Sequence, residues 1–357
     1  MVPARTTNAE TSPQRLSTLD ALRGLASLGV AWFHFTNGNT GFLPNGVLKT
    51  SGRYGWLGVE MFFVISGFII PYALQRSRYG VANYGAFIVK RIIRLDPPYL
   101  VSIVILLALN FLSGFAPGFK GPGFAVSIPQ LALHLGYVNV FFGYQWLNPV
   151  FWTLAIELQY YLLIGLLFPL ISCRSLTVRV CAFCSLTTVA VSFPAEHFIS
   201  GYLFLFMFGM SVFQFRAGIL SASQFSALAA VLALGAWHVN GPIVTMVGLT
   251  TALAIAFVDF RMPAALVFFG DISYSLYLLH VPIGGRVINL GARFAHSTLS
   301  QLAVLGIALG ASTVASWLMY KYVERPAQRW SSAIKYRWNE PRPNLAVIIP
   351  VSIGSVS

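Results

Sequence analysis

A succession of long apolar runs constrains the fold of this chain more than any other feature. A hydrocarbon core of ~30 Å needs about 20 apolar residues in a helix, and about ten runs of roughly that length occur. Backbone polar groups have no water partners in lipid, so such runs are expected to be helices. The sequence therefore predicts an all-α, polytopic transmembrane helical bundle. Its predicted spans are 17–36, 55–75, 97–114, 150–171, 177–194, 198–215, 221–238, 242–258, 264–288 and 300–323.

Charge distribution sets the predicted orientation. Hydrophobic residues make up 57% of the chain and charged residues only 9%, with a formal net charge of +13. A charge of this size can indicate a nucleic-acid surface, but the basic residues fall mainly in alternate connecting segments. That distribution predicts both termini in the cytoplasm, a multi-pass protein of the inner or plasma membrane with lipid around it, and no nucleic-acid partner.

The predicted domain organisation is simple. Residues 1–15 are polar and are expected to form a disordered cytoplasmic N-terminus, residues 16–330 the transmembrane domain, and residues 331–357 a cytoplasmic tail. The longest predicted outer loop, 115–149, contains an apolar stretch that is too short to span and is expected to lie in the interface or to re-enter.

His34 and Arg23 stand out because both are ionisable and both lie in the first apolar run. Eleven residues separate them, which is about 16 Å along a helix and brings them to the same helical face. A charged side chain in the middle of a spanning helix costs at least ~2.5 kcal/mol on insertion scales. A histidine and an arginine held there are therefore functional candidates.

Counting residues from the predicted span ends assigns a depth to each embedded ionisable group. One set converges on the outer half of the bundle: His34, Glu60, Glu157 and His280. A second set gathers at the cytoplasmic side: Arg23, Lys90, Arg91 and Arg94. The arrangement suggests an anion held inside and proton chemistry further out, which suits a long phosphorylated donor such as acyl-coenzyme A. Lys90, Arg91 and Arg94 would share one helix face, although a basic cluster that only sets topology is the alternative.

Six segments, in order and spread over nearly the whole chain, carry a family resemblance. They are RLSTLDALRGLA continuing to His34 and Phe35, GVEMFFVISGF (58–68), RIIRLDPPY (91–99), FWTLAIELQYY (151–161), SYSLYLLH (273–280) and ERP (324–326). In these segments the chain resembles the acyltransferase-3 family of integral membrane O-acyltransferases. Glu60, Asp96 and Thr153 depart from the residues usual in that family.

The resemblance implies transfer of an acyl group, most often acetyl, from cytoplasmic acyl-coenzyme A to a hydroxyl of a carbohydrate, a lipid-linked glycan or a glycoside. It implies that His34 is the essential histidine, that Arg91 and Arg94 bind the donor, and that Glu157 is the acid of a tryptophan-to-glutamate motif. Acyl-coenzyme A is then a substrate, and no permanently bound cofactor is expected.

Chemistry supports the same roles. A sugar hydroxyl is a poor nucleophile at neutral pH, and a histidine is well suited to take its proton as it attacks a thioester. We predict that His34 is this base and that Glu157 orients its imidazole, if the two meet across a helix interface. A covalent acyl-histidine step is an open alternative.

Further residues are predicted to line the acceptor path or to support the catalytic groups. Thr153, Glu157 and Tyr161 share one helix face, so Trp152 and Tyr161 can line the path. Each prediction has a plainer alternative, such as bracing of the bundle by Glu60, an ordinary hydrogen bond of His280, or close helix contact at Ser66–Gly67. The full predicted set is Glu60, Ser66, Trp152, Thr153, Tyr161 and His280.

Metal binding and transport are the rival functions. Cys181 and Cys184 lie in an apolar run without nearby acids or histidines, which favours packing, and no metal site is expected. A proton-coupled transporter or flippase of a glycan or small solute would also bury histidine and glutamate. The hydropathy pattern shows no inverted repeat, and the paired arginines fit a phosphorylated donor better. A membrane scaffold, the third alternative, would tolerate alanine at both His34 and Glu157.

Overall fold

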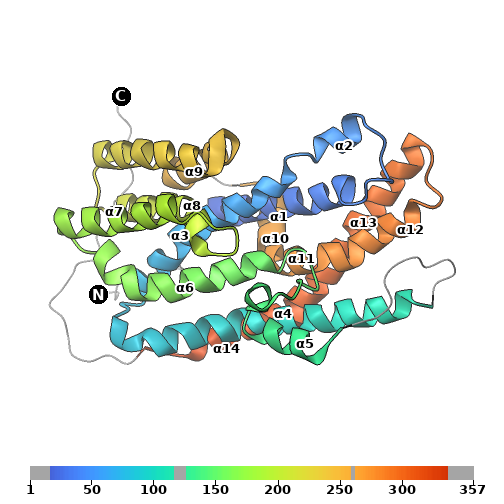
Figure 1. Cartoon of the computed structure of the whole chain (residues 1–357), viewed down its shortest axis with the longest axis horizontal. Coiled ribbons are helices and arrows are strands. Elements are labelled where there is room, and N and C mark those ends of the chain that lie inside the picture. The colour runs from blue at the N-terminus through green and yellow to red at the C-terminus, as the bar shows by residue number, and fades with distance from the viewer. Residues whose placement is uncertain (1–16, 116–125, 259–261, 337–357) are drawn as a thin grey trace, which may run out of the picture.

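The computed structural model describes residues 17–115, 126–258 and 262–336, and these are helical with no strand (Figure 1). Most of the long helices lie side by side along one direction, as lipid-spanning helices must. The α-helices are α1 Ser17–Asn37, α2 Val47–Ser51, α3 Gly58–Arg76, α4 Tyr84–Ser113, α5 Ile128–Leu135, α6 Trp152–Ile171, α7 Leu176–Ser192, α8 Leu203–Arg216, α9 Ala222–Phe257, α10 Ala264–Asp271, α11 Ser273–Leu279, α12 Arg286–Gly291, α13 Thr298–Met319 and α14 Arg325–Ala333. Short 3₁₀ segments are η1 Gly55–Leu57, η2 Val81–Asn83, η3 Asn139–Phe142 and η4 Ile199–Tyr202, and π-helical segments are η5 His280–Gly285 and η6 Tyr320–Glu324.

The all-α prediction is confirmed for the described residues. By length and composition, six helices there can cross a membrane, or up to seven if the bent pair Ala264–Asp271 and Ser273–Gly291 is one span. The predicted spans 221–238 and 242–258 correspond to the two arms of α9, which breaks at Gly241, where φ is 79°, and folds back so that the Phe225 and Phe257 rings near its two ends lie 5.9 Å apart. The ten-span count and the cytoplasmic location of both termini stay predictions.

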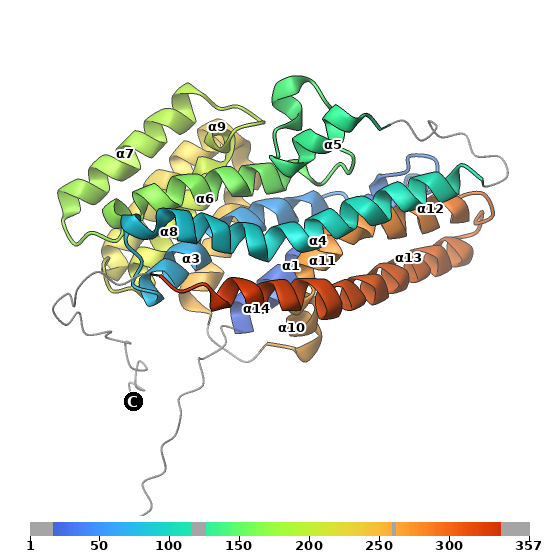
Figure 2. The ribbon, with the colours of Figure 1, turned by 90° about the horizontal axis from the view of Figure 1, so that it is seen from below.

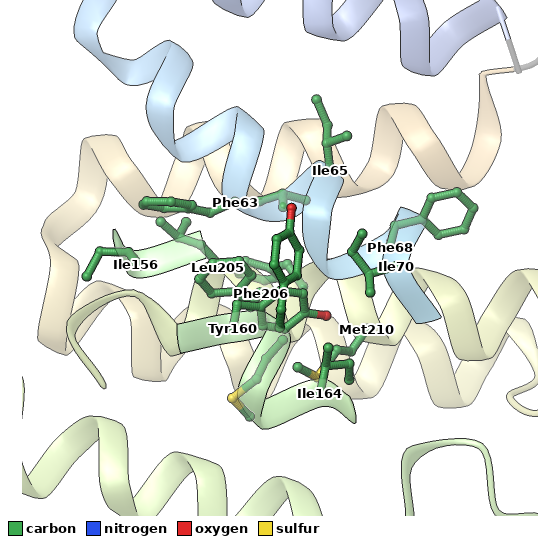
Figure 3. Packing of buried hydrophobic residues seen from close by; sticks show 14 of the residues in the cluster. Phe63, Ile65, Phe68, Ile70, Ile156, Tyr160, Ile164, Leu205, Phe206 and Met210 are labelled. Atoms are coloured by element: carbon green, nitrogen blue, oxygen red, sulfur yellow. The ribbon is translucent and has the colours of Figure 1, made fainter. Parts of the chain in front are cut away.

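Helix α8 is the centre of the bundle, since every residue from Leu203 to Gln214 is buried. Helix α3 packs directly on it: a Cβ added to Gly67 would lie 2.2 Å from the Phe206 carbonyl oxygen, and one added to Gly209 would lie 2.1 Å from that of Val64. The Tyr160 ring of α6 stacks on Phe206 at 4.1 Å between centroids (Figure 3). The close helix contact expected at Gly67 is therefore confirmed.

Helix α1 is held in place by equally close contacts. Gly24 packs against the Leu266 carbonyl of α10, Gly270 of α10 packs against the Asp20 backbone, and Gly58 of α3 packs against the Ala26 carbonyl. A side chain at any of these glycines would push the backbones apart. These contacts fix α1, and with it the positions of Arg23 and His34, relative to α3 and α10.

Helix α4 is longer than expected. The predicted span began at residue 97, whereas the helix begins at Tyr84 and contains both Pro97 and Pro98. Proline removes one helical hydrogen bond and usually marks a boundary. Here packing carries the helix past both prolines, and Tyr274 donates to the neighbouring Leu95 carbonyl at 2.9 Å. Arg91 and Arg94 therefore lie well inside a helix and not at its end.

The C-terminal part of the described chain lies along α4 (Figure 2). Helix α14 crosses the predicted domain boundary at residue 330 and ends at Ala333. The Ser331 hydroxyl donates to the Lys90 carbonyl at 2.8 Å, so the start of the predicted tail packs on the bundle. The predicted disordered N-terminus, 1–15, and most of the tail lie outside the described residues.

Candidate active site

Two histidines face each other where α1 ends and α11 passes into η5. The ring centroids of His34 and His280 are 5.1 Å apart. His280 is fully buried, and its Nδ1–H donates to the Leu276 carbonyl at 3.0 Å. Its Nε2 is buried without a hydrogen-bond partner among the described residues. The Tyr277 ring lies 5.9 Å from that of His280. The Nε2 of His280 is therefore left to accept a hydrogen bond beside the His34 ring.

One face of α6 carries a line of polar side chains, as predicted. The Thr153 and Tyr277 hydroxyls hydrogen-bond at 2.8 Å. One turn further along, Glu157 Oε1 accepts hydrogen bonds from Ser66 Oγ at 3.2 Å and from the Tyr161 hydroxyl. Spacing of four residues between Thr153, Glu157 and Tyr161 explains why all three point to one side.

Arg91 continues this line on the far side of Tyr161. Its guanidinium lies 5.4 Å from the Tyr161 ring and 5.3 Å from the Phe87 ring, in cation–π geometry. The Arg91 Nε is buried and has no hydrogen-bond partner in the described chain. A guanidinium that is held in place by aromatic rings and retains free donors is well suited to receive an anion.

Arg94 and Arg23 extend the positive charge that begins at Arg91, and the buried acid Glu324 lies near them. Arg94 lies within electrostatic reach of Arg91, Arg23 and Glu324. Arg23 Nε donates to Ser273 Oγ at 3.2 Å. Three arginines from α1 and α4 thus form one cluster inside the bundle.

Glu324 is a site residue that sequence reasoning missed. It is 2% exposed, and its carboxyl accepts hydrogen bonds from Ser275 at 2.6 Å and from Gln328 at 3.0 Å. From the sequence alone, the neighbouring Arg325 offers a local ion pair as the simplest account of this residue. The structure instead places it near Arg23 and Arg94, which lie far away in the chain. The sequence feature that could have identified Glu324 as a site residue is its place in the ERP segment, one of the six that carry the family resemblance.

Lys90 lies within electrostatic reach of Arg91, but its ammonium is directed at the segment after α14. Its ammonium donates to the Ile334 carbonyl at 3.0 Å and lies 4.9 Å from the Tyr336 ring. The side chain therefore holds the segment after α14. Sequence spacing places residues on a helix face, but the neighbouring element decides where a long flexible side chain points.

Glu157 and His34 are not joined by a hydrogen bond in the described structure. Glu157 Oε1 accepts hydrogen bonds from Ser66 and Tyr161. The ring next to His34 is that of His280. Counting depth along each helix predicted that both lie at a similar depth in the bundle. It could not give the rotation of α6 relative to α1, which points Glu157 at α3.

Glu60 lies among aromatic side chains. It is 6% exposed, its Oε2 has no partner within the described residues, and Tyr202 and Tyr277 are within electrostatic reach. The Trp152 and Tyr202 rings are 5.5 Å apart, and Phe63 packs against both. Aromatic faces beside an unpaired carboxyl oxygen are the kind of surface that sugars bind.

Asp96, one of the departures from the family pattern, forms its hydrogen bond with a tyrosine and not with the arginines. The Tyr137 hydroxyl donates to its Oδ1 at 2.9 Å. Burial and the neighbouring Asp96 carboxyl raise the pKa of Tyr137, so its hydroxyl keeps the proton that it donates. Asp96 is thus directed to the segment after α5. Among the described residues, no group of three histidine, cysteine or acidic side chains could hold a metal ion.

Comparison with known proteins supports the resemblance drawn from the motifs. The model of the acyltransferase domain family, Acyl_transf_3, matches residues 16–321. This match includes every proposed site residue from Arg23 to His280, and it ends just before Glu324.

Three relatives show how far the similarity extends. O-acetyltransferase OatA of Staphylococcus aureus is 30% identical over 171 residues, which are 45% of this chain and 25% of the relative. A protein of Acidianus two-tailed virus, provisionally named an acetyltransferase, is 32% identical over 44% of this chain and 43% of its own length. Protein 2 in the picA locus of Rhizobium radiobacter is 27% identical over 32% of this chain and 55% of its own length. The matches to the first two cover less than half of each relative, and no solved structure matches.

Proposed function

Since the chain belongs to the acyltransferase-3 family, we propose that it is a membrane O-acetyltransferase, moving an acetyl group from cytoplasmic acetyl-coenzyme A to a carbohydrate or glycoside hydroxyl. The observation that carries the proposal is the polar line through the apolar bundle. It runs from the arginines, past Tyr161 and Glu157, to Thr153, Tyr277 and the histidines.

The arginine end is the proposed donor site. Arg23, Arg91 and Arg94 offer guanidinium groups for the phosphates of a coenzyme A thioester, and Arg91 keeps a free buried donor. Thr153 and Tyr161 are eight residues apart, about 12 Å along α6. The extended arm of the donor has to cover a distance of this order to bring its thioester to the histidines.

The histidine end is the proposed reaction site. His34 takes the proton of the acceptor hydroxyl as the new carbon–oxygen bond forms. The carbon–sulfur bond of the thioester breaks, and the leaving thiolate receives that proton from His34 to give free coenzyme A. The Glu60 Oε2, which has no partner among the described residues, and the rings of Trp152 and Tyr202 are the proposed contacts for a sugar. We place the enzyme in the cell membrane.

The test is acyl-dependent thiol release from inverted membrane vesicles, with labelled acetyl-coenzyme A and extracted glycans as acceptors. We expect release and labelling in the wild type, loss of both in His34→Ala, and a raised donor KM in Arg91→Ala. Gly306→Ala is the matched control, since nothing lies within 4 Å of a Cβ there. Solute movement without thiol release would favour a transporter, and full activity in His34→Ala would remove the proposed base.

A further inference from the structure

The environment of His280 is unusual for a histidine with only a structural role. It is fully buried, yet only one of its two ring nitrogens has a partner in the described chain. A buried polar atom without a partner costs roughly 1–3 kcal/mol, so a second partner is expected at some stage of function. His280 also begins the π-helical segment η5, a distortion frequent at functional sites.

The hydrogen bond to Leu276 decides which nitrogen is available. A carbonyl only accepts, so Nδ1 carries the proton, and Nε2 of the neutral ring is left as an acceptor. The neighbouring ring of His34 is 5.1 Å away between centroids. In the structure the two rings are tilted by 48° and Nε2 has no partner among the described residues, so the bond needs a turn of the His34 ring; at this centroid separation the ring nitrogens come within about 2.7–3.2 Å once their edges face each other.

Other polar groups around His280 have partners of their own or lie beside η5. The Tyr277 hydroxyl bonds to Thr153 and to the Val150 carbonyl. Arg286 reaches the Pro282 carbonyl, Asn110 and Ser113. On α13, Ser312 lies against Gly284. The titratable group whose ring faces His280 is His34, with the ring centroids 5.1 Å apart.

We propose that His280 is the positioning residue for His34, accepting at Nε2 the N–H of the His34 nitrogen that does not face the acceptor hydroxyl. This inference rests on the proposed function. His280 keeps its own proton on Nδ1 throughout, while His34 takes the hydroxyl proton on its other nitrogen and passes it to the thiolate. The bond fixes the tautomer of His34 in the way that a carboxylate does in a catalytic triad. Glu157, engaged by Ser66 and Tyr161, is not needed for this role.

The test compares four variants in the vesicle assay. His280→Phe keeps a ring of similar size without an acceptor, His280→Gln supplies an acceptor oxygen, and His280→Asn supplies one on a shorter side chain. Ser312→Ala is the control, because it removes another buried and unpartnered polar atom next to η5. Thermal unfolding in detergent checks that each variant is folded.

For His280→Phe we expect kcat to fall about 10- to 100-fold, the usual effect of losing an orienting partner, with the donor KM within about twofold of wild type. His280→Gln should recover part of the loss, and His280→Asn less, a comparison that holds even if the phenylalanine variant does not fold. Ser312→Ala should keep the wild-type kcat. Wild-type kcat in His280→Phe, or no advantage of Gln over Asn, would overturn the inference. Because His34→Ala would still be inactive, this failure is distinct from failure of the proposed function.

Discussion

Removing one oxygen atom from Tyr161 tests whether the two ends of the polar line act together. The Tyr161 ring lies under Arg91 and its hydroxyl donates to Glu157, so the residue links the proposed donor site to the acid. The substitution Tyr161→Phe keeps the ring, and with it the cation–π contact. It removes only the hydrogen bond, leaving Ser66 as the hydrogen-bond partner of Glu157 Oε1 among the described residues.

The expected magnitude follows from the group that loses its partner. Leaving a buried acceptor without its donor costs about 1–3 kcal/mol, and more for a charged group. If this hydrogen bond positions Glu157 relative to the bound donor during transfer, its loss should lower kcat/KM about 5- to 150-fold. The assay is thiol release at donor concentrations below KM.

The adjacent Tyr160 supplies a matched control. Its hydroxyl is 3.4 Å from the Gly67 carbonyl, longer than a normal bond of this kind, and its ring packs on Phe206. Tyr160→Phe should change kcat/KM less than about threefold, because such a weak bond contributes little. In a Glu157→Gln background the Tyr161→Phe effect should shrink, as expected for two residues in contact. Equal effects of the two tyrosine substitutions would refute the reasoning.

Two further predictions concern stability. Gly209→Ala should lower the free energy of unfolding by about 1–3 kcal/mol, because its Cβ would lie 2.1 Å from the Val64 carbonyl oxygen. Gly306→Ala should leave it unchanged, because nothing lies within 4 Å of a Cβ there. Thermal unfolding in detergent measures both variants, and equal midpoints would contradict the packing argument. Burial lowers the pKa of His134 below its usual 6.5. The unfolded chain then binds this proton more readily than the folded chain, so stability should fall as the pH drops through about 6.5, and His134→Gln should weaken that dependence in unfolding measurements across pH.

Much of the site could be predicted because its residues repeat at helical spacing. Thr153, Glu157 and Tyr161 were expected on one face of a helix, and they lie there. The depth of an embedded residue follows from counting along its own helix, which correctly suggested that His34 and His280 could meet. Both inferences use only the regular geometry of one helix at a time.

What could not be predicted depends on how one helix is rotated against another. Glu157 was expected at His34, but α6 points it at Ser66 of α3, and His280 takes the place next to His34. Lys90 was grouped with the arginines; it is within electrostatic reach of Arg91, but its ammonium donates to the Ile334 carbonyl after α14. Glu324 joined the cluster only because η6 packs against α4 and α11.

The sequence by itself determined the fold class, the embedded ionisable groups and the face on which each one lies, because apolar length and helical periodicity are local properties. The tertiary structure alone decided which polar groups meet. Close contacts at Gly24, Gly58, Gly67 and Gly209 set the rotation and separation of α1, α3, α8 and α10. These contacts join residues that are far apart in the chain. Close packing of the backbones there permits one relative placement of the helices, and no local sequence pattern specifies it.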